Sequence, residues 1–181
     1  MGTKSFSGGI HPHDEKEYSQ ELAFERMPPP GRIVLPLSQH LGKAAKALVS
    51  KGDPVIAGML VAEADGFVSA SIHSSVCGTV ASLGRHAHTC GTPAEAILIT
   101  PSEDQSQREL MPQLDPQRVS PAEIRERVHQ AGIVGQGGAA FPTVVKLSPP
   151  HARRMEVAIL NGCECEPYLT RDYRLMLERP D

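Results

Sequence analysis

The sequence predicts an α+β fold in two parts: an N-terminal all-β part, then an incomplete α/β part. Short apolar segments punctuated by Gly, Pro and Asp fill residues 31–100, a pattern typical of a small barrel or sandwich. A helix with complete capping signals then opens at Ser120, and a glycine-rich loop follows it. Farther on, the apolar residues 157–160 have the length of a buried strand.

Composition limits the classes of protein that are possible. Of the 181 residues, 40% are apolar and 22% are charged, so the chain can form a core, although only 4% are aromatic. The net charge of -3 gives no electrostatic basis for binding nucleic acid. No apolar stretch approaches the ~20 residues of a membrane helix, and the N-terminus lacks the apolar run of a signal peptide. We therefore expect a cytoplasmic protein whose membrane attachment comes through a partner.

Residues 1–30 are predicted to be an arm, because proline fixes φ and restricts the residue before it. In the β part, turns are expected at residues 51–54 and at Asp65-Gly66, the latter a hairpin signal. Residues 41–48 have helical propensity, but we expect their end to be extended. Residues 101–119 are polar and contain prolines, as in a linker. The expected strands are residues 33–35, 47–49, 55–56, 59–62, 67–72, 77–81 and 96–99.

The helix that begins the second part, residues 120–181, has complete start signals. Ser120 is the predicted N-cap, Pro121 occupies the first helical position, and Glu123 completes a capping box. Gly132 is the expected C-terminal cap. The buried stripe is predicted to consist of Ile124, Val128 and Ala131.

The glycine-rich block that follows has the residues of a phosphate grip. Gly135, Gly137 and Gly138 allow positive φ and close approach of a ligand to the backbone. A second helix is expected from Pro142, and its N-terminal amides would attract an anion. Lys146, one turn farther on, reaches the same place. The block therefore predicts a phosphate site.

Two other nucleotide-binding motifs fit the glycine block poorly. It matches a weak G-x-G-x-x-A pattern, but a capped helix precedes it where a dinucleotide fold needs a strand. An NAD-binding domain is therefore a third and weaker hypothesis. Walker A is excluded because no Gly-Lys-Ser/Thr occurs.

A second block, residues 161–167, follows the predicted strand 156–160. Asn161, Glu164 and Glu166 would line a cleft at the carboxyl end of that strand, although solvent exposure is the commoner fate of glutamate. Cys163 and Cys165 are expected to be packed thiols, because a C-x-C pair supplies too few ligands for a cluster. The histidine pairs at 11 and 13 and at 86 and 88 lack a third ligand, so no metal site is predicted.

Both blocks resemble the flavin-binding region that is shared by the NADH-oxidising subunit of respiratory complex I and the C subunit of the Rnf/Rsx ion-translocating complex. Residues 132–147 are similar to both families. Residues 164–168, with Asp172 and residues 174–176, are similar to the Rnf C subunit, as is Gly8-Gly-Ile-His-Pro12. Residues 49–55 and 64–70 resemble its barrel–sandwich hybrid domain, a biotinyl/lipoyl-like fold. No lysine occupies the Asp65-Gly66 turn, which argues against a carrier function.

The resemblance implies site residues but assigns no catalytic residue. By this resemblance, FMN contacts come from Gly135, Gly137, Gly138, Lys146 and Asn161, while Glu164 and Glu166 line the FMN/NADH cleft. Three residues depart from the family pattern. Gln136 replaces the arginine of complex I, Ala140 replaces a glycine, and Cys163 stands where complex I has an acid.

The resemblance also implies a function and a location. In the family, FMN takes a hydride from NADH and passes electrons to [4Fe-4S] clusters, in a complex that couples NADH/ferredoxin electron transfer to ion translocation. The expected partners are its membrane and cytoplasmic subunits, on the cytoplasmic side of the inner membrane. The cluster motifs and a second flavin segment are absent, so we expect an N-terminal portion with an incomplete flavin site, inactive by itself. The alternative is a docking module that binds no cofactor.

Overall fold

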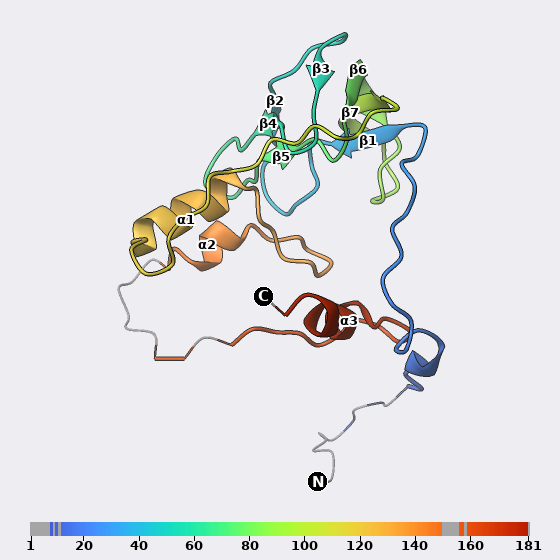
Figure 1. Ribbon diagram of the computed structural model, residues 1–181, viewed down its shortest axis with the longest axis vertical. Helices are drawn as coiled ribbons and strands as arrows, with labels where there is room; N and C mark the ends of the chain where they lie inside the picture. The colour runs from blue at the N-terminus through green and yellow to red at the C-terminus, as the bar shows by residue number, and fades with distance from the viewer. Residues whose placement is uncertain (1–7, 9, 11, 150–155, 158, 181) are drawn as a thin grey trace. The chain divides into compact units, whose positions relative to one another are not determined.

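The computed structural model describes residues 8, 10, 12–149, 156–157 and 159–180, which form two compact units (Figure 1). The first, here called the β unit, is Pro28–Ala152. The second, here called the terminal unit, consists of Met1–Met27 and Arg153–Asp181. Of the predicted arm, residues 1–7, 9 and 11 lie outside the described residues.

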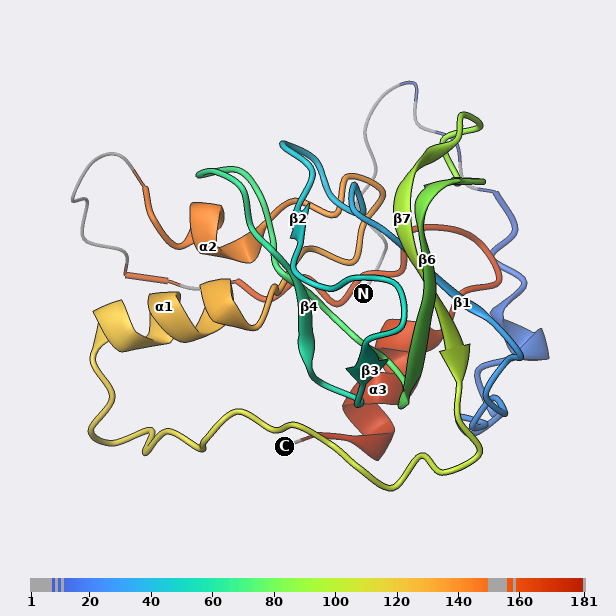
Figure 2. The same ribbon diagram turned by 90° about the horizontal axis from the view of Figure 1, so that it is seen from above.

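Two antiparallel sheets form the core of the β unit. Figure 2 shows the long strands β6 and β7 side by side. In the four-stranded sheet the order is β1 (Ile33–Pro36), β7 (Ala94–Pro101), β6 (Gly78–His86) and β3 (Pro54–Val55). In the three-stranded sheet it is β2 (Lys46–Ala47), β4 (Leu60–Glu63) and β5 (Ile72–His73).

Small aliphatic side chains from both sheets fill the core, in keeping with an aromatic content of only 4%. Val61 of β4 and Ile97 and Ile99 of β7 are 0% exposed, and Val80 of β6 is 1% exposed. Burial of each such side chain contributes about 1.5–3 kcal/mol. The barrel–sandwich prediction for this part of the chain is therefore confirmed.

One predicted turn of the β unit is confirmed, and one predicted strand is shorter than expected. At residues 51–54 the backbone N–H of Asp53 donates to the carbonyl of Ser50 at 3.1 Å, and the predicted turn is confirmed. The strand expected at residues 67–72 is shortened to Ile72–His73. The hydroxyl of the buried Ser69 accepts from Asp65 N–H and donates to the Lys43 carbonyl. These side-chain bonds replace ladder pairing in that segment.

The polar segment 101–119 is irregular, as predicted, but it is fixed to the sheet at several points. The Gln105 side chain accepts from the backbone N–H of Cys77 at 2.9 Å and donates to its carbonyl at 2.8 Å. Arg108 forms an isolated parallel bridge with Ala57. The segment is therefore packed along the β unit.

Helix α1 (Pro121–Gln130) has the predicted capping box. The Ser120 hydroxyl accepts from Glu123 N–H at 3.2 Å, and the Glu123 carboxylate accepts from Ser120 N–H at 2.8 Å. Gly132 follows the helix at φ +64°, as expected for a C-terminal cap. The predicted buried stripe is wrong: no residue of α1 is buried, and Ile124 is 43% exposed. No helix in the described part of the chain is long and apolar enough to cross a membrane.

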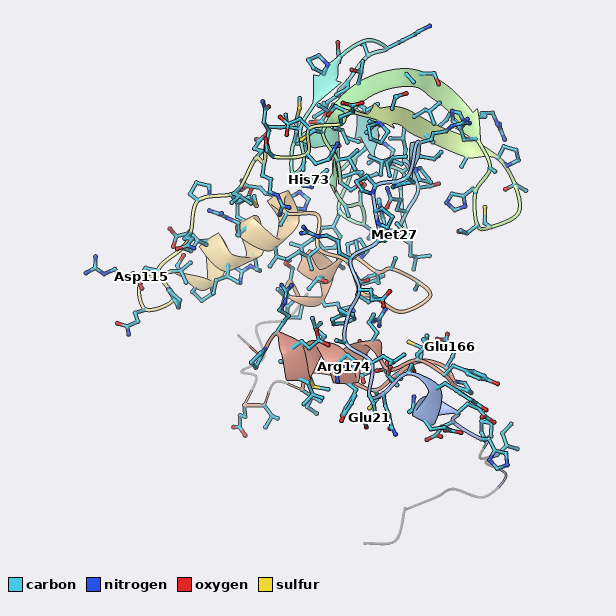
Figure 3. All side chains as sticks on the ribbon, turned by 45° about the vertical axis from the view of Figure 1, so that its right-hand side comes forward. Glu21, Met27, His73, Asp115, Glu166 and Arg174 are labelled. Atoms are coloured by element: carbon cyan, nitrogen blue, oxygen red, sulfur yellow. The ribbon has the colours of Figure 1, made fainter. Side chains whose placement is uncertain are left out.

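In the terminal unit, the predicted arm packs against α3 (Arg171–Glu178). It contains the short 3-10 helix η1 (Lys16–Tyr18), whose Tyr18 ring stacks on Tyr168 with 6.3 Å between centroids. The Phe24 N–H donates to the Glu178 carboxylate at 3.1 Å, and the Arg174 guanidinium donates to the Gln20 carbonyl. Figure 3 shows Arg174 on α3 beside this arm. The arm is therefore bonded to residues about 150 positions away.

The buried strand predicted at residues 156–160 is wrong. Val157, Ile159 and Leu160 are 77%, 86% and 96% exposed and form no strand, while Ala158 lies outside the described residues. A buried strand needs neighbouring strands to satisfy its backbone groups. The described residues of the terminal unit contain no strand that could pair with it.

Candidate functional site

The glycine block forms a closed loop after α1. A bridge between Val134 and Pro142 joins its two sides, and the Gly135 N–H donates to the Phe141 carbonyl at 2.9 Å. The tip is fixed to the rest of the β unit because Leu41 N–H donates to the Ala139 carbonyl at 3.0 Å. The loop is therefore held at its base and at its tip.

The three glycines place no side chains over the backbone of the loop, but they do not adopt positive φ. None of Gly135, Gly137 and Gly138 has positive φ, so that prediction is wrong. Ala140 takes this conformation instead, at φ 44°. A Cβ at Gly135 would lie 3.2 Å from the Lys146 ammonium, whereas at Gly137 and Gly138 it would meet nothing within 4 Å. Gly137 and Gly138 thus leave the backbone open to solvent.

Helix α2 (Thr143–Lys146) begins after Pro142, as predicted, but it is a single turn. The expected anion-attracting N-terminus is largely absent. Thr143 N–H donates to Ile133, Val145 N–H donates to Pro142, and Pro142 has no N–H. The Lys146 ammonium remains as the main positive charge. Among the described residues no carboxylate lies within 4.0 Å of it.

The second block belongs to the terminal unit, and one of its carboxylates has a structural role. The Glu164 Oε1 accepts from the N–H of Tyr173 at 3.1 Å, in the first turn of α3. This bond replaces the missing side-chain cap at Thr170. The other oxygen, Oε2, is buried and has no hydrogen-bond partner among the described residues.

The neighbouring residues of the second block are exposed. Asn161 Oδ1 accepts from Cys163 N–H at 2.9 Å, so its amide nitrogen remains as a donor. Glu166 is exposed (Figure 3). Cys163 and Cys165 are also exposed, so the prediction of packed thiols is wrong. The glycine block lies in one unit and the Asn/Glu block in the other. That both blocks line one cleft stays a prediction.

Sequence reasoning missed a cavity in the β unit. It has a volume of about 760 Å³, and its lining includes His40, His88 and Cys90 together with Gly138 and Ala139 of the glycine loop. The only sequence signal was the pair of histidines at 86 and 88, which suggested plain surface residues. The lining comes from three separate segments, so no local motif predicts it.

Comparisons with known proteins match both parts of the chain. Residues 4–104 match the RnfC barrel sandwich hybrid domain, and residues 128–181 match the Nuo51 FMN-binding domain. Over 179 residues the chain is 43% identical to the C subunit of a proton-translocating ferredoxin:NAD(+) oxidoreductase complex from Clostridium ljungdahlii, covering 98% of this chain and 39% of the relative.

Two further relatives carry similar names. The C subunit of an ion-translocating oxidoreductase complex from Rhodobacter capsulatus is 43% identical over 98% of this chain and 34% of its own length. The C subunit of a Na(+)-translocating ferredoxin:NAD(+) oxidoreductase complex from Acetobacterium woodii is 37% identical, over 98% of this chain and 40% of its own. The chain thus spans less than half the length of these relatives. Since the barrel match covers more than half of the chain, the chain belongs to the family of C subunits of Rnf-type ion-translocating oxidoreductase complexes.

Proposed function

We propose that this chain supplies part of the FMN site of a subunit in a membrane-associated complex that couples ferredoxin/NAD(H) electron transfer to ion translocation. The observation that carries the proposal is the glycine loop with the Lys146 ammonium beside Gly135, in a segment matching an FMN-binding domain. The names of the relatives, which describe ferredoxin:NAD(+) oxidoreductase complexes, support the same reaction class.

The chemistry of the glycine loop fits a phosphate. The backbone N–H groups of Gly137 and Gly138 donate to no described residue, and a Cβ added at either glycine would meet nothing within 4 Å. Lys146 supplies a positive charge without a carboxylate partner in the described chain. Free amides and an ammonium are the donors that phosphate sites use. These residues would hold the FMN phosphate.

The Asn/Glu block would serve the other end of the cofactor. The Asn161 amide nitrogen is free to donate, and Glu164 Oε2 can accept from a hydroxyl of the ribityl chain or of NADH. Glu166 would add negative charge at the cleft. Bound FMN would accept a hydride from NADH and pass single electrons to iron–sulfur clusters in the longer family proteins. The role of this chain is to bind and orient the flavin.

A titration of the full-length subunit with FMN tests the proposal. Hydrogen bonds to charged groups are worth about 1.5–3 kcal/mol, so Lys146→Ala should weaken FMN binding roughly 10- to 150-fold. Riboflavin lacks the phosphate, so its affinity should not change. Lys51→Ala, at an exposed turn, is the matched control. Absence of FMN binding, or equal FMN affinity in the parent and Lys146→Ala, would contradict the proposal.

A non-catalytic docking module is the second candidate. Helix α3 favours it, because Leu175, Met176 and Leu177 are 49%, 57% and 55% exposed and suit contact with another surface. Its partners would be other subunits of the complex at the cytoplasmic face of the membrane. Flavin released from the purified full-length subunit on denaturation, measured by its fluorescence, decides between the two candidates, since a docking module would release none.

A further inference from the structure

The N-terminal arm is bonded to the loop that joins the Asn/Glu block to α3. The backbone N–H of Tyr168 donates to the Asp14 carbonyl at 2.7 Å, and the Lys16 ammonium donates to the Leu169 carbonyl at 2.6 Å. The Tyr18 ring stacks on the Tyr168 ring with 17° between the ring planes. Backbone, charged and aromatic contacts therefore join the arm to this loop within the terminal unit.

Ser19 joins the arm to the start of α3 through a single hydroxyl group. This hydroxyl donates to the Tyr168 carbonyl at 2.9 Å and accepts from the Thr170 hydroxyl at 3.0 Å. Thr170 directly precedes α3 and is 7% exposed, so its hydroxyl needs a partner within the protein. The Thr170 side chain forms no cap of the helix. The N–H of Tyr173, at the third helical position, is therefore left for another acceptor.

Glu164 of the Asn/Glu block is that acceptor, and α3 supports the block at a second point as well. The Glu164 Oε1 accepts from the Tyr173 N–H at 3.1 Å. Two residues earlier, a Cβ added at Gly162 would lie 3.3 Å from the methyl carbon of Met176 in α3. The described residues of the terminal unit contain no strand that could support the block. The position of Glu164 therefore depends on α3.

Helix α3 in turn needs contacts with the arm. It has eight residues, none of them buried, whereas isolated helices shorter than about 12–15 residues are only marginally stable. Near its C-terminal end, the Glu178 carboxylate accepts from the Phe24 N–H at 3.1 Å. The Arg174 guanidinium donates to the Gln20 carbonyl at 3.4 Å. Together with the Ser19 hydroxyl, these bonds hold both ends of the helix.

We propose that the N-terminal arm is part of the flavin site, and that Ser19 is a positioning residue that keeps Glu164 in place through α3. The inference rests on the proposed function, in which the Glu164 Oε2 accepts from a hydroxyl of the ribityl chain or of NADH. Oε1 is held by the Tyr173 N–H, so the orientation of the helix fixes where Oε2 points. Ser19 itself touches no ligand and acts through this helix.

The proposal gives the arm a different role from the one that the family matches suggest. The barrel match begins at residue 4 and so includes the arm. The bonds of the arm lead to residues 168–178, which lie within the FMN-binding match of residues 128–181. When these bonds are weakened, a smaller fraction of molecules holds α3 in place, and the apparent affinity for the cofactor falls with that fraction.

Amide hydrogen exchange and FMN titration of the full-length subunit test the proposal. Ser19→Ala removes both hydroxyl bonds, whereas Ser19→Thr keeps the hydroxyl. In Ser19→Ala, exchange in α3 should speed up roughly two- to tenfold, about the effect of one net hydrogen bond on an equilibrium, and the dissociation constant for FMN should rise. Ser19→Thr should restore both values. Ser75→Ala, at an exposed position of the β unit, is the matched control and should change neither.

Double variants separate positioning from a general loss of structure. In the Ser19→Ala protein, Glu164→Gln should weaken FMN binding less than it does alone, because Glu164 is already displaced. Lys146→Ala should keep its full effect there, since Lys146 belongs to the β unit. Unchanged exchange in α3, or an undiminished effect of Glu164→Gln, would overturn the role of Ser19 while the Lys146→Ala effect still supports the flavin site. Equal FMN affinity in the parent and Lys146→Ala would contradict the proposed function and, with it, this inference.

Discussion

Gly132→Ala tests how the glycine block is anchored to the β sheets. Gly132 lies directly after α1 at φ +64°, a conformation that costs an L-residue about 1–2 kcal/mol. A Cβ there would be 2.0 Å from the Ser71 carbonyl oxygen and 2.9 Å from its carbon. The obstacle is backbone in the segment that leads into β5, so it cannot rotate aside.

The cost of the positive φ and the cost of the steric clash add, and a smaller effect on the unfolded chain opposes them. Forcing extra volume into packed surroundings costs about 1–3 kcal/mol. The alanine also lowers the entropy of the unfolded chain, which raises the free energy of unfolding by about 0.4–1 kcal/mol. The net loss is about 3 kcal/mol, a large part of the about 5–15 kcal/mol by which domains are stable.

Urea unfolding followed by far-ultraviolet circular dichroism measures the loss. With a slope of about 1–3 kcal/mol/M, the midpoint should fall by about 1–3 M. Gly137→Ala is the matched control, because its Cβ meets nothing within 4 Å and its φ is not positive. It should stay within about 0.5 kcal/mol of the parent. Equal midpoints for the two variants would refute the anchoring role of Gly132.

Three further outcomes are expected. Ser120→Ala removes the α1 cap and should lower the free energy of unfolding by about 1 kcal/mol in the same assay. Burial lowers the pKa of His73, so the unfolded chain binds more protons and stability should fall as pH drops through about 6.5; His73→Gln should abolish this slope. Arg174→Ala should speed amide exchange in α3 by roughly 10-fold or more, whereas Arg171→Ala, whose side chain is 44% exposed, should not.

The sequence-based predictions succeed where the physical cause is local. The capping box at Ser120 and Glu123 and the turn at residues 51–54 require only neighbouring side chains and backbone angles. Gly132 is a similar case, because the end of a helix needs a residue that accepts positive φ. These structures form independently of contacts with the rest of the chain, so local sequence is enough to predict them.

The predictions fail where contacts between residues far apart in the sequence determine the local structure. The shortened strand before Ile72 depends on the bond from Ser69 to the Lys43 carbonyl, 26 positions away. The apolar residues 157–160 have the composition of a buried strand, but burial requires neighbouring strands. The expected positive φ is taken by Ala140, since bonds at both ends of the loop set its path.

The orientation of Glu164, a candidate site residue, also depends on residues far away in the sequence. In the sequence, residues 12–27 precede the β part and look like a separate arm, yet their bonds lead to residues 168–178. Those bonds hold α3, and α3 holds Glu164 through the Tyr173 amide. One carboxylate oxygen is thereby fixed while the buried Oε2 stays without a described partner. The orientation of this candidate site residue thus depends on a helix that the opposite end of the chain holds in place.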